Sequence, residues 1–228
     1  MEVYISINGV LRNLIQKLEY NYTNNFLETE IEVEEGVEPF DYRVIYPIRN
    51  DNLLTSFMFE SREEFNNFLY VDYPLEIFGH STLSYPGVIM DLHTLIHEHP
   101  EINFTIIGMD EYGKARPATL FFLSKYGFLG NNIRFFRSED IDKEWKKCDI
   151  WITDNYEIIQ NCPNSKSAVK FNTDYNYYFT HKNETNKIDL QCLKSLTPTI
   201  TSTLMRLLRY VGRCTQITKQ HNRKSLCL

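Results

Sequence analysis

Residues 2–11 read Glu-Val-Tyr-Ile-Ser-Ile-Asn-Gly-Val-Leu, and the fold prediction starts from this stretch. Its first six residues are mostly apolar or β-branched, which is typical of a strand buried on both faces of a parallel sheet. Asn8-Gly9 follows directly and favours a tight turn. The next apolar residues recur at helical spacing (Val10, Leu14, Ile15, Leu18). The chain therefore opens with a strand, a turn and a helix.

The same alternation returns after residue 100. Strands are predicted at 102–107, 133–136, 149–153 and 168–171, with helices at 117–126 and 140–147. Strands that alternate with helices imply a parallel sheet covered on both faces. We therefore expect an α/β fold, a three-layer sandwich with strand 2–7 in the middle of a five-stranded parallel sheet. Its expected neighbours are 102–107 and 149–153.

Residues 22–99 do not follow this regular pattern. A glutamate-rich stretch at 28–38 predicts an exposed strand, Ser61-Arg62-Glu63-Glu64 matches a helix-capping box, and a helix is expected from Pro86 to Pro100. We divide the chain into a core of residues 1–21 and 100–190, an inserted cap of residues 22–99, and a C-terminal helical arm of residues 191–228.

Composition narrows the class of protein. Hydrophobic residues make up 43% and charged residues 24%, as in ordinary globular domains. The sequence has no apolar run of about 18 residues and no signal-peptide layout at its start, so we expect no membrane span and a cytosolic site of synthesis. Five scattered cysteines without a C-x-x-C pair argue against a disulfide framework and a cysteine zinc site.

The charge is distributed unevenly along the chain. Residues 190–228 contain seven basic residues and no acidic residue. Because the whole chain carries a net charge of -6, the other 189 residues carry -13. This asymmetry predicts an electrostatic partner for the C-terminal arm. The basic side chains that we expect to bind it are Arg206, Arg209, Arg213, Lys219, Arg223 and Lys224, although Arg206, Arg209 and Arg213 could equally form a solvated helix face.

Polar residues cluster where predicted strands end, which is where open α/β sheets bind ligands. The first strand ends in Ser6-Ile7-Asn8-Gly9-Val10-Leu11, and a later one is bracketed by Asp149 and Asp154 with Thr153 between them. Here the chain resembles the haloacid dehalogenase (HAD) superfamily, and within it the small 5'(3')-deoxyribonucleotidases. Residues 113–123 also look similar to uncharacterised tailed-phage relatives of these enzymes. The resemblance covers about 1–20 and 100–175.

The resemblance implies a catalytic motif that this chain lacks. Family members open with D-x-D-G-V-L, in which the first Asp attacks phosphorus and the second protonates the leaving group; here Ser6 and Asn8 stand at those positions. The family's later acids hold Mg²⁺, which would place Asp149, Thr153 and Asp154 in a vestigial site. The family also uses a Ser or Thr after its second strand, and in this chain Gly108 or Met109 occupies that position. The family uses a lysine further along the chain, and the resemblance implies that Lys125 or Lys143 stands at that position.

These substitutions predict that the chain is not a working phosphatase. Covalent phosphoryl transfer needs a carboxylate nucleophile, and Asn8 cannot act as a general acid. Losing both acids also removes two Mg²⁺ ligands, so we expect no metal and no cofactor. The alternative is a nucleotide phosphohydrolase with an unusual, Mg²⁺-dependent site; a weaker one is a regulator that binds phosphate at the Gly9 loop. Asp149 and Asp154 could also be simple caps, and His93 and His97, with i, i+4 spacing, are a weak zinc candidate.

The favoured expectation is a non-catalytic protein of a tailed phage, a structural or assembly component of the virion neck, tail or capsid. Its partners would be other virion proteins or copies of itself, with nucleic acid as a further partner of the basic arm. It would be found in the host cytoplasm during assembly and afterwards in the virion. This origin rests on the resemblance, since a fold does not fix a function.

Overall fold

The computed structural model describes residues 1–26, 44–179, 188–190 and 192–193 of the 228-residue chain. Its main sheet has six strands in the order β5-β4-β1-β6-β7-β8, and every neighbouring pair is parallel. The strands are β1 (Glu2–Ser6), β4 (Asn103–Met109), β5 (Ile133–Phe136), β6 (Ile150–Thr153), β7 (Ser167–Phe171) and β8 (Ile188–Leu190). The predicted five-stranded parallel sheet, with the first strand between 102–107 and 149–153, is confirmed, and β8 extends it by one strand.

Strand β1 lies in the middle of the sheet, as its apolar sequence predicts. Val3 pairs with Phe104 of β4 on one side and with Ile150 of β6 on the other. Side chains alternate between the two faces: Val3 and Ile5 point into one core cluster, and Tyr4 points into the other. Both faces are apolar because both are covered by helices.

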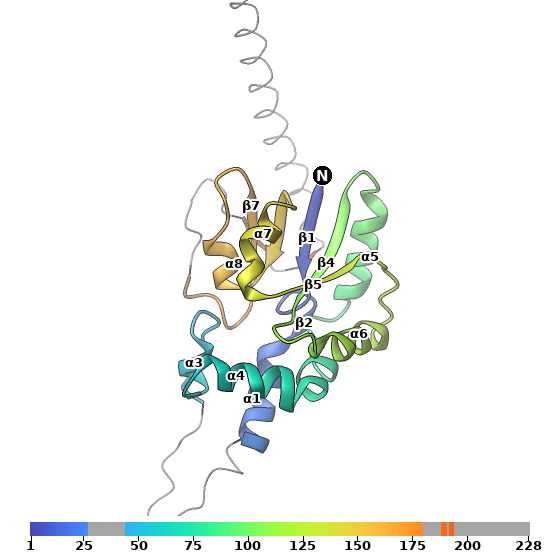
Figure 1. Ribbon diagram of the computed structural model, residues 1–228. Coiled ribbons are helices and arrows are strands. Elements are labelled where there is room, and N and C mark those ends of the chain that lie inside the picture. The colour runs from blue at the N-terminus through green and yellow to red at the C-terminus, as the bar shows by residue number, and fades with distance from the viewer. Residues whose placement is uncertain (27–43, 180–187, 191, 194–228) are drawn as a thin grey trace, which may run out of the picture.

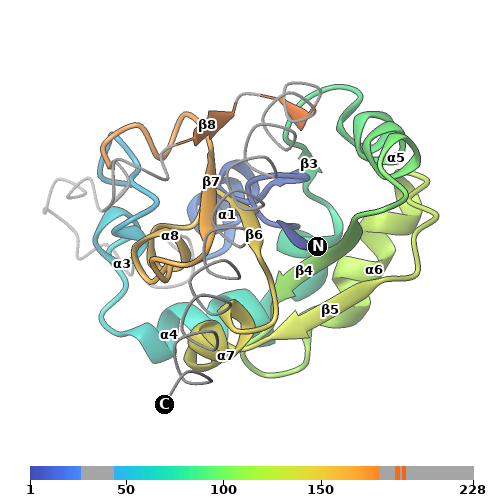
Figure 2. The same ribbon diagram turned by 90° about the horizontal axis from the view of Figure 1, so that it is seen from above.

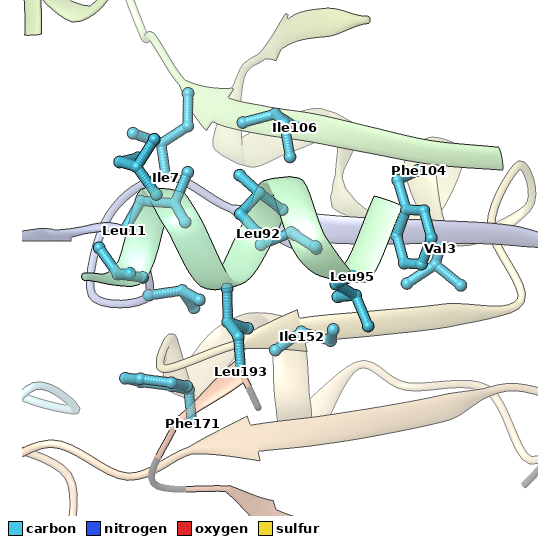
Figure 3. Close-up of a cluster of buried hydrophobic side chains, with 14 of the residues drawn as sticks. Val3, Ile7, Leu11, Leu92, Leu95, Phe104, Ile106, Ile152, Phe171 and Leu193 are labelled. Atoms are coloured by element: carbon cyan, nitrogen blue, oxygen red, sulfur yellow. The ribbon is translucent and has the colours of Figure 1, made fainter. Parts of the chain in front are cut away.

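Two helices cover each face, which gives the three layers (Figures 1 and 2). On one face lie α5 (Val88–Glu98) and α6 (Ala115–Lys125); on the other lie α7 (Ile141–Trp145) and α8 (Tyr156–Gln160). Figure 3 shows Leu92 and Leu95 of α5 facing the sheet residues Ile106 and Ile152. Helix α5 thus packs on the sheet although we placed it in the insertion; the domain boundaries themselves stay a prediction.

The remaining helical segments lie beyond the carboxyl ends of the strands (Figure 1). They are α1 (Leu14–Asn21), η1 (Tyr22–Phe26), α3 (Leu53–Ser56), α4 (Arg62–Asn67), η2 (Phe68–Asp72) and η3 (Leu75–Gly79). They share a second, aromatic-rich core in which Tyr22 contacts Phe57, Phe59 and Phe68. We call these segments the cap helices. Ser61 caps α4 as predicted, with its Oγ accepting a hydrogen bond from the Glu64 amide at 3.1 Å.

The chain after the first strand differs from the prediction in one respect. The helix was expected from Val10, but it begins at Leu14, where the Asn13 side chain caps it. Residues before it form a tight loop and the short strand β2 (Arg12–Asn13), which pairs antiparallel with β3 (Thr82–Leu83). A short 3-10 helix, η4 (Ser138–Asp140), precedes α7. Val10 and Leu11 are buried in the loop and not on a helix, which is why their apolar spacing misled the prediction.

Some predictions fall outside the described residues. These are the strand at 28–38, the helical structure expected in the C-terminal arm after residue 193, and the six basic side chains Arg206, Arg209, Arg213, Lys219, Arg223 and Lys224. Within the described part of the chain, no helix is long and apolar enough to cross a membrane.

Candidate functional site

A cavity of about 440 Å³ lies between the carboxyl ends of the strands and the cap helices. The ends of β1, β4, β6 and β7 supply Ser6, Met109, Thr153 and Phe171 to its wall. Helices α1 and α4 and the loop around Asn50 supply the opposite wall. The cavity is therefore where parallel α/β sheets place their ligand sites.

Ser6, the last residue of β1, is held by two internal hydrogen bonds. Its Oγ lies 2.9 Å from Thr153 Oγ1 and accepts a hydrogen bond from Trp151 Nε1 at 3.0 Å. The Ser6 side chain is buried, and neither partner can remove its proton. The structure therefore brings Ser6 and Thr153 together, as the sequence predicts, but in an arrangement that does not activate the hydroxyl.

Asn8, in the loop after β1, is bound to an arginine that the sequence did not point to. Asn8 Oδ1 accepts a hydrogen bond from Arg12 Nε at 2.7 Å. Arg12 is completely buried, and its Nη1 donates to the Phe78 carbonyl at 2.9 Å and to Thr119 Oγ1 at 3.1 Å. Desolvation lowers the pKa of Arg12 to about 9, so the guanidinium is still charged at neutral pH. Arg12 thus ties the loop after β1 to the cap helices and to α6.

Asp154, directly after β6, is buried between the first loop and a residue of the insertion. The Asn50 side-chain amide donates to Asp154 Oδ2 at 2.8 Å and to the Asp154 carbonyl at 3.0 Å. On the other side, a Cβ on Gly9 would fall 1.9–2.2 Å from the Asp154 carboxyl atoms. Gly9 has a φ of +75°, which suits glycine. Desolvation raises the pKa of Asp154 to about 7, although its hydrogen bonds oppose the shift.

This raised pKa predicts that Asp154→Asn changes how stability depends on pH. The carboxyl has an ordinary pKa of 3.8 and a folded-state pKa of about 7, so the folded state favours the proton. The stability contribution of this group is full below about pH 4 and is lost as the pH rises through 7. Relative to wild type, Asp154→Asn should gain about 2–4 kcal/mol of unfolding free energy between pH 4.5 and pH 8. Urea unfolding of both proteins at pH 4.5 and pH 8 measures these free energies. If the free-energy difference between variant and wild type is the same at the two pH values, the prediction is contradicted.

The residues present do not fit the Mg²⁺ ion that active HAD enzymes use. Asp154 Oδ2 already accepts the Asn50 amide, and Asn8 Oδ1 already accepts Arg12. Asp110, which follows β4, is turned away to cap α6, where its carboxylate accepts the backbone N–H groups of Ala115 and Arg116. Mg²⁺ prefers several free, anionic oxygen ligands. Within the described residues, no group of three or more His, Cys, Asp or Glu side chains could hold a metal.

Three other predicted site residues lie away from the cavity. Asp149 lies at the amino end of β6, where its carboxylate accepts the Glu2 amide at 2.9 Å and pairs with Lys166 at 3.2 Å; this corrects the expectation that it brackets the site. Lys125 is the last residue of α6, with its ammonium 5.0 Å from the Tyr126 ring centroid. Lys143 pairs with Asp140 at 2.5 Å. None of the three lines the cavity.

The lining of the cavity is acidic. Among the described residues that line it are five acidic side chains, Asp51, Glu111, Asp154, Glu157 and Asp174, and one basic side chain, Arg62. The Arg62 guanidinium is already paired with Glu157 at 2.7 Å. A phosphate dianion would therefore meet like charge here, without the free lysine or arginine that anion sites use. The geometry disfavours phosphate and suits a neutral or cationic group.

No protein-family model matches the chain, and no curated protein matches it in sequence. Solved structures do match its shape. A haloacid-dehalogenase-like hydrolase from Burkholderia xenovorans LB400 has a TM-score of 0.50 at 10% identity and covers 89% of this chain and 97% of its own. A haloacid-dehalogenase-like hydrolase from Bacteroides fragilis also has a TM-score of 0.50 at 12% identity, and the match covers 86% of this chain and 98% of that one. A third such hydrolase, from Xanthomonas campestris, has a TM-score of 0.50 at 9% identity, and the match covers 93% of this chain and 98% of that one. At such identities the likeness shows the fold alone: this chain has a HAD-like fold.

Proposed function

We propose that this chain is a non-catalytic protein with a HAD-like fold that acts through contacts with other proteins, as a structural or assembly component of a tailed-phage virion. One observation carries the non-catalytic part. The side chains of Ser6 and Asn8, which the sequence resemblance places at the positions of the two family acids, are both engaged by internal hydrogen bonds. A site with these two residues lacks the carboxylate nucleophile and the general acid that the resemblance implies at the end of the first strand.

The surroundings of these two residues support the same proposal. An active site places its reacting groups toward the substrate and leaves room for the transferred group. Here Gly9 packs directly against the Asp154 carboxyl, and the Asn50 amide covers the other side of that carboxyl. Gly9 and Asn50 thus contact the Asp154 carboxyl from two sides, although this carboxyl still lines the cavity.

The assembly part of the proposal rests on sequence. Residues 113–123 resemble uncharacterised tailed-phage proteins in sequence, and residues 190–228 contain seven basic residues and no acid, whereas the other 189 residues carry a net charge of -13. Oppositely charged surfaces increase association rates and help to select partners. The expected partners are other virion proteins or further copies of this chain, and packaged nucleic acid would be a second target of the same charge.

Truncation after Leu196 tests the assembly part. If the arm serves contacts between chains, the shortened protein should keep a near-normal melting temperature but lose self-association or partner binding. High salt should partly reproduce the loss in the full-length protein, because it screens exposed charges. Analytical ultracentrifugation and thermal melting measure the two properties separately. Unfolding of the truncated protein would instead show that the arm completes the core.

A further inference from the structure

We propose that the acidic cavity is the receptor for the chain's own basic C-terminal segment, residues 194–228, whose lysine and arginine side chains enter it. The inference rests on the proposed function, because it names the surface that the basic arm contacts. It differs from the family's use of this place in the fold, where the bound group is an anion.

The unpaired acids of the cavity call for a cation. Glu111 and Asp174 line it, and neither forms an ion pair with a described residue. Glu111 accepts a hydrogen bond from the Ser138 amide at 3.0 Å, which fixes the carboxylate without neutralising it. Asp51 and Glu157 are paired, with Arg49 and Arg62. Arg62 lies close enough to Glu111 to interact with its charge but is itself paired with Glu157, so an entering ammonium or guanidinium group would find two carboxylates that form no ion pair with a described residue.

Tyr70 is a second and independent sign of a ligand. This residue lines the cavity but is only 4% exposed, and its ring packs on Phe78 at 5.2 Å between centroids. Its hydroxyl forms no hydrogen bond with another described residue, and it is not one of the polar atoms that are sealed from solvent without a partner, so the hydroxyl is accessible from the cavity. A polar group that enters the cavity would supply a hydrogen-bond partner. Tyr156 and Tyr175 also line the cavity.

The C-terminal segment has the matching chemistry and begins nearby. It contains seven basic residues and no acid. The last described residue, Leu193, donates its backbone N–H to the Tyr85 hydroxyl at 3.0 Å, and Tyr85 lines the cavity. The 35 residues that follow could span roughly 100 Å when extended, which reaches this cavity or that of a second copy. Long lysine and arginine stems can pass an apolar rim while the charged group continues inward.

Photo-crosslinking in the full-length protein tests this assignment. Asn66 lines the cavity from α4, and its side chain makes no hydrogen bond to another described residue, so Asn66→p-benzoylphenylalanine places the probe there. Mass spectrometry should find crosslinks to peptides from 194–228. Mixing isotopically light and heavy copies tells whether the captured segment belongs to the same or to another copy, and either supports the assignment. The same probe at Glu98, an exposed residue of α5 outside the cavity, is the positional control.

Charge variants make the test specific. Glu111→Gln with Asp174→Asn should lower the crosslink yield about threefold to tenfold, as should high salt. Glu98→Gln with Asp142→Asn removes the same charge from exposed sites outside the cavity and should leave the yield unchanged. If the double cavity variant melts early, Asp174→Asn alone serves, since Asp174 is exposed. Absence of crosslinks to 194–228, or a yield insensitive to the cavity acids, overturns the assignment; the proposed function would still stand if truncation abolished association.

Discussion

Gly9→Ala is expected to destabilise the protein by about 2–5 kcal/mol or to prevent folding. The added Cβ would meet the Asp154 carboxyl at 1.9–2.2 Å, far inside van der Waals contact, and the backbone φ of +75° is unfavourable for alanine. Left-handed backbone costs a non-glycine residue about 1–2 kcal/mol, and overpacking a core adds about 1–3 kcal/mol. The free energy of unfolding in urea measures the sum.

A matched glycine separates these two effects. Gly113 has the same φ of +75°, but a Cβ there would meet no atom within 4 Å, so Gly113→Ala should cost only the backbone strain of about 1–2 kcal/mol. Combining Gly9→Ala with Asp154→Ala removes the clashing carboxyl and should be less destabilising than the sum of the two single changes. Equal losses at Gly9 and Gly113 would show that the loop does not pack against Asp154 as described.

Arg12→Ala is expected to have an effect of similar size, about 3–5 kcal/mol. The guanidinium lies 4.7 Å from the Phe78 ring centroid and 5.5 Å from that of Phe122, and it satisfies buried acceptors on Asn8, Phe78 and Thr119. Removing it leaves a cavity and unpaired polar groups between the first loop, the cap helices and α6. Urea unfolding and near-ultraviolet circular dichroism, which reports aromatic packing, measure the loss.

Arg12→Met is the comparison that assigns the cause. Methionine retains most of the apolar stem but not the hydrogen bonds, so its loss of stability should be smaller than that of Arg12→Ala. Arg137, whose side chain is 60% exposed, provides the surface control, and Arg137→Ala should change stability by less than about 0.5 kcal/mol. A loss at Arg12 no larger than at Arg137 would contradict the role given to this buried charge.

The sheet could be predicted because its sequence signals are local. Strands 2–7, 102–107 and 149–153 are short apolar runs, and their alternation with helices leaves few parallel arrangements. Strand β8 could not be found in the same way, because three residues are too short for a periodic signal. The helix at Val10 was placed too early, since buried loop residues and buried helix residues share the same apolar character.

The site could be predicted only in part. Ser6, Asn8, Thr153 and Asp154 meet because they end neighbouring strands, which the predicted sheet order already implies. Asn50 could not have been found, because it is 104 residues from Asp154 in sequence and lies in an irregular loop. Arg12 also escaped notice, since a single arginine after a strand carries no signal of complete burial. Asp149 was wrongly assigned to the site. The four residues of β6 separate it from Asp154, so it lies at the amino ends of the strands and the site lies at their carboxyl ends.

The most direct test of the non-catalytic assignment is phosphate release by the purified full-length protein with Mg²⁺. Nucleoside monophosphates and a generic aryl phosphate are the substrates, and Ser6→Ala is the matched variant because it removes only the hydroxyl that the proposal assigns to the nucleophile position. We predict that wild-type release does not exceed background and that Ser6→Ala is indistinguishable from it. Robust wild-type turnover that disappears in Ser6→Ala would show that Ser6 is a nucleophile and would contradict the account.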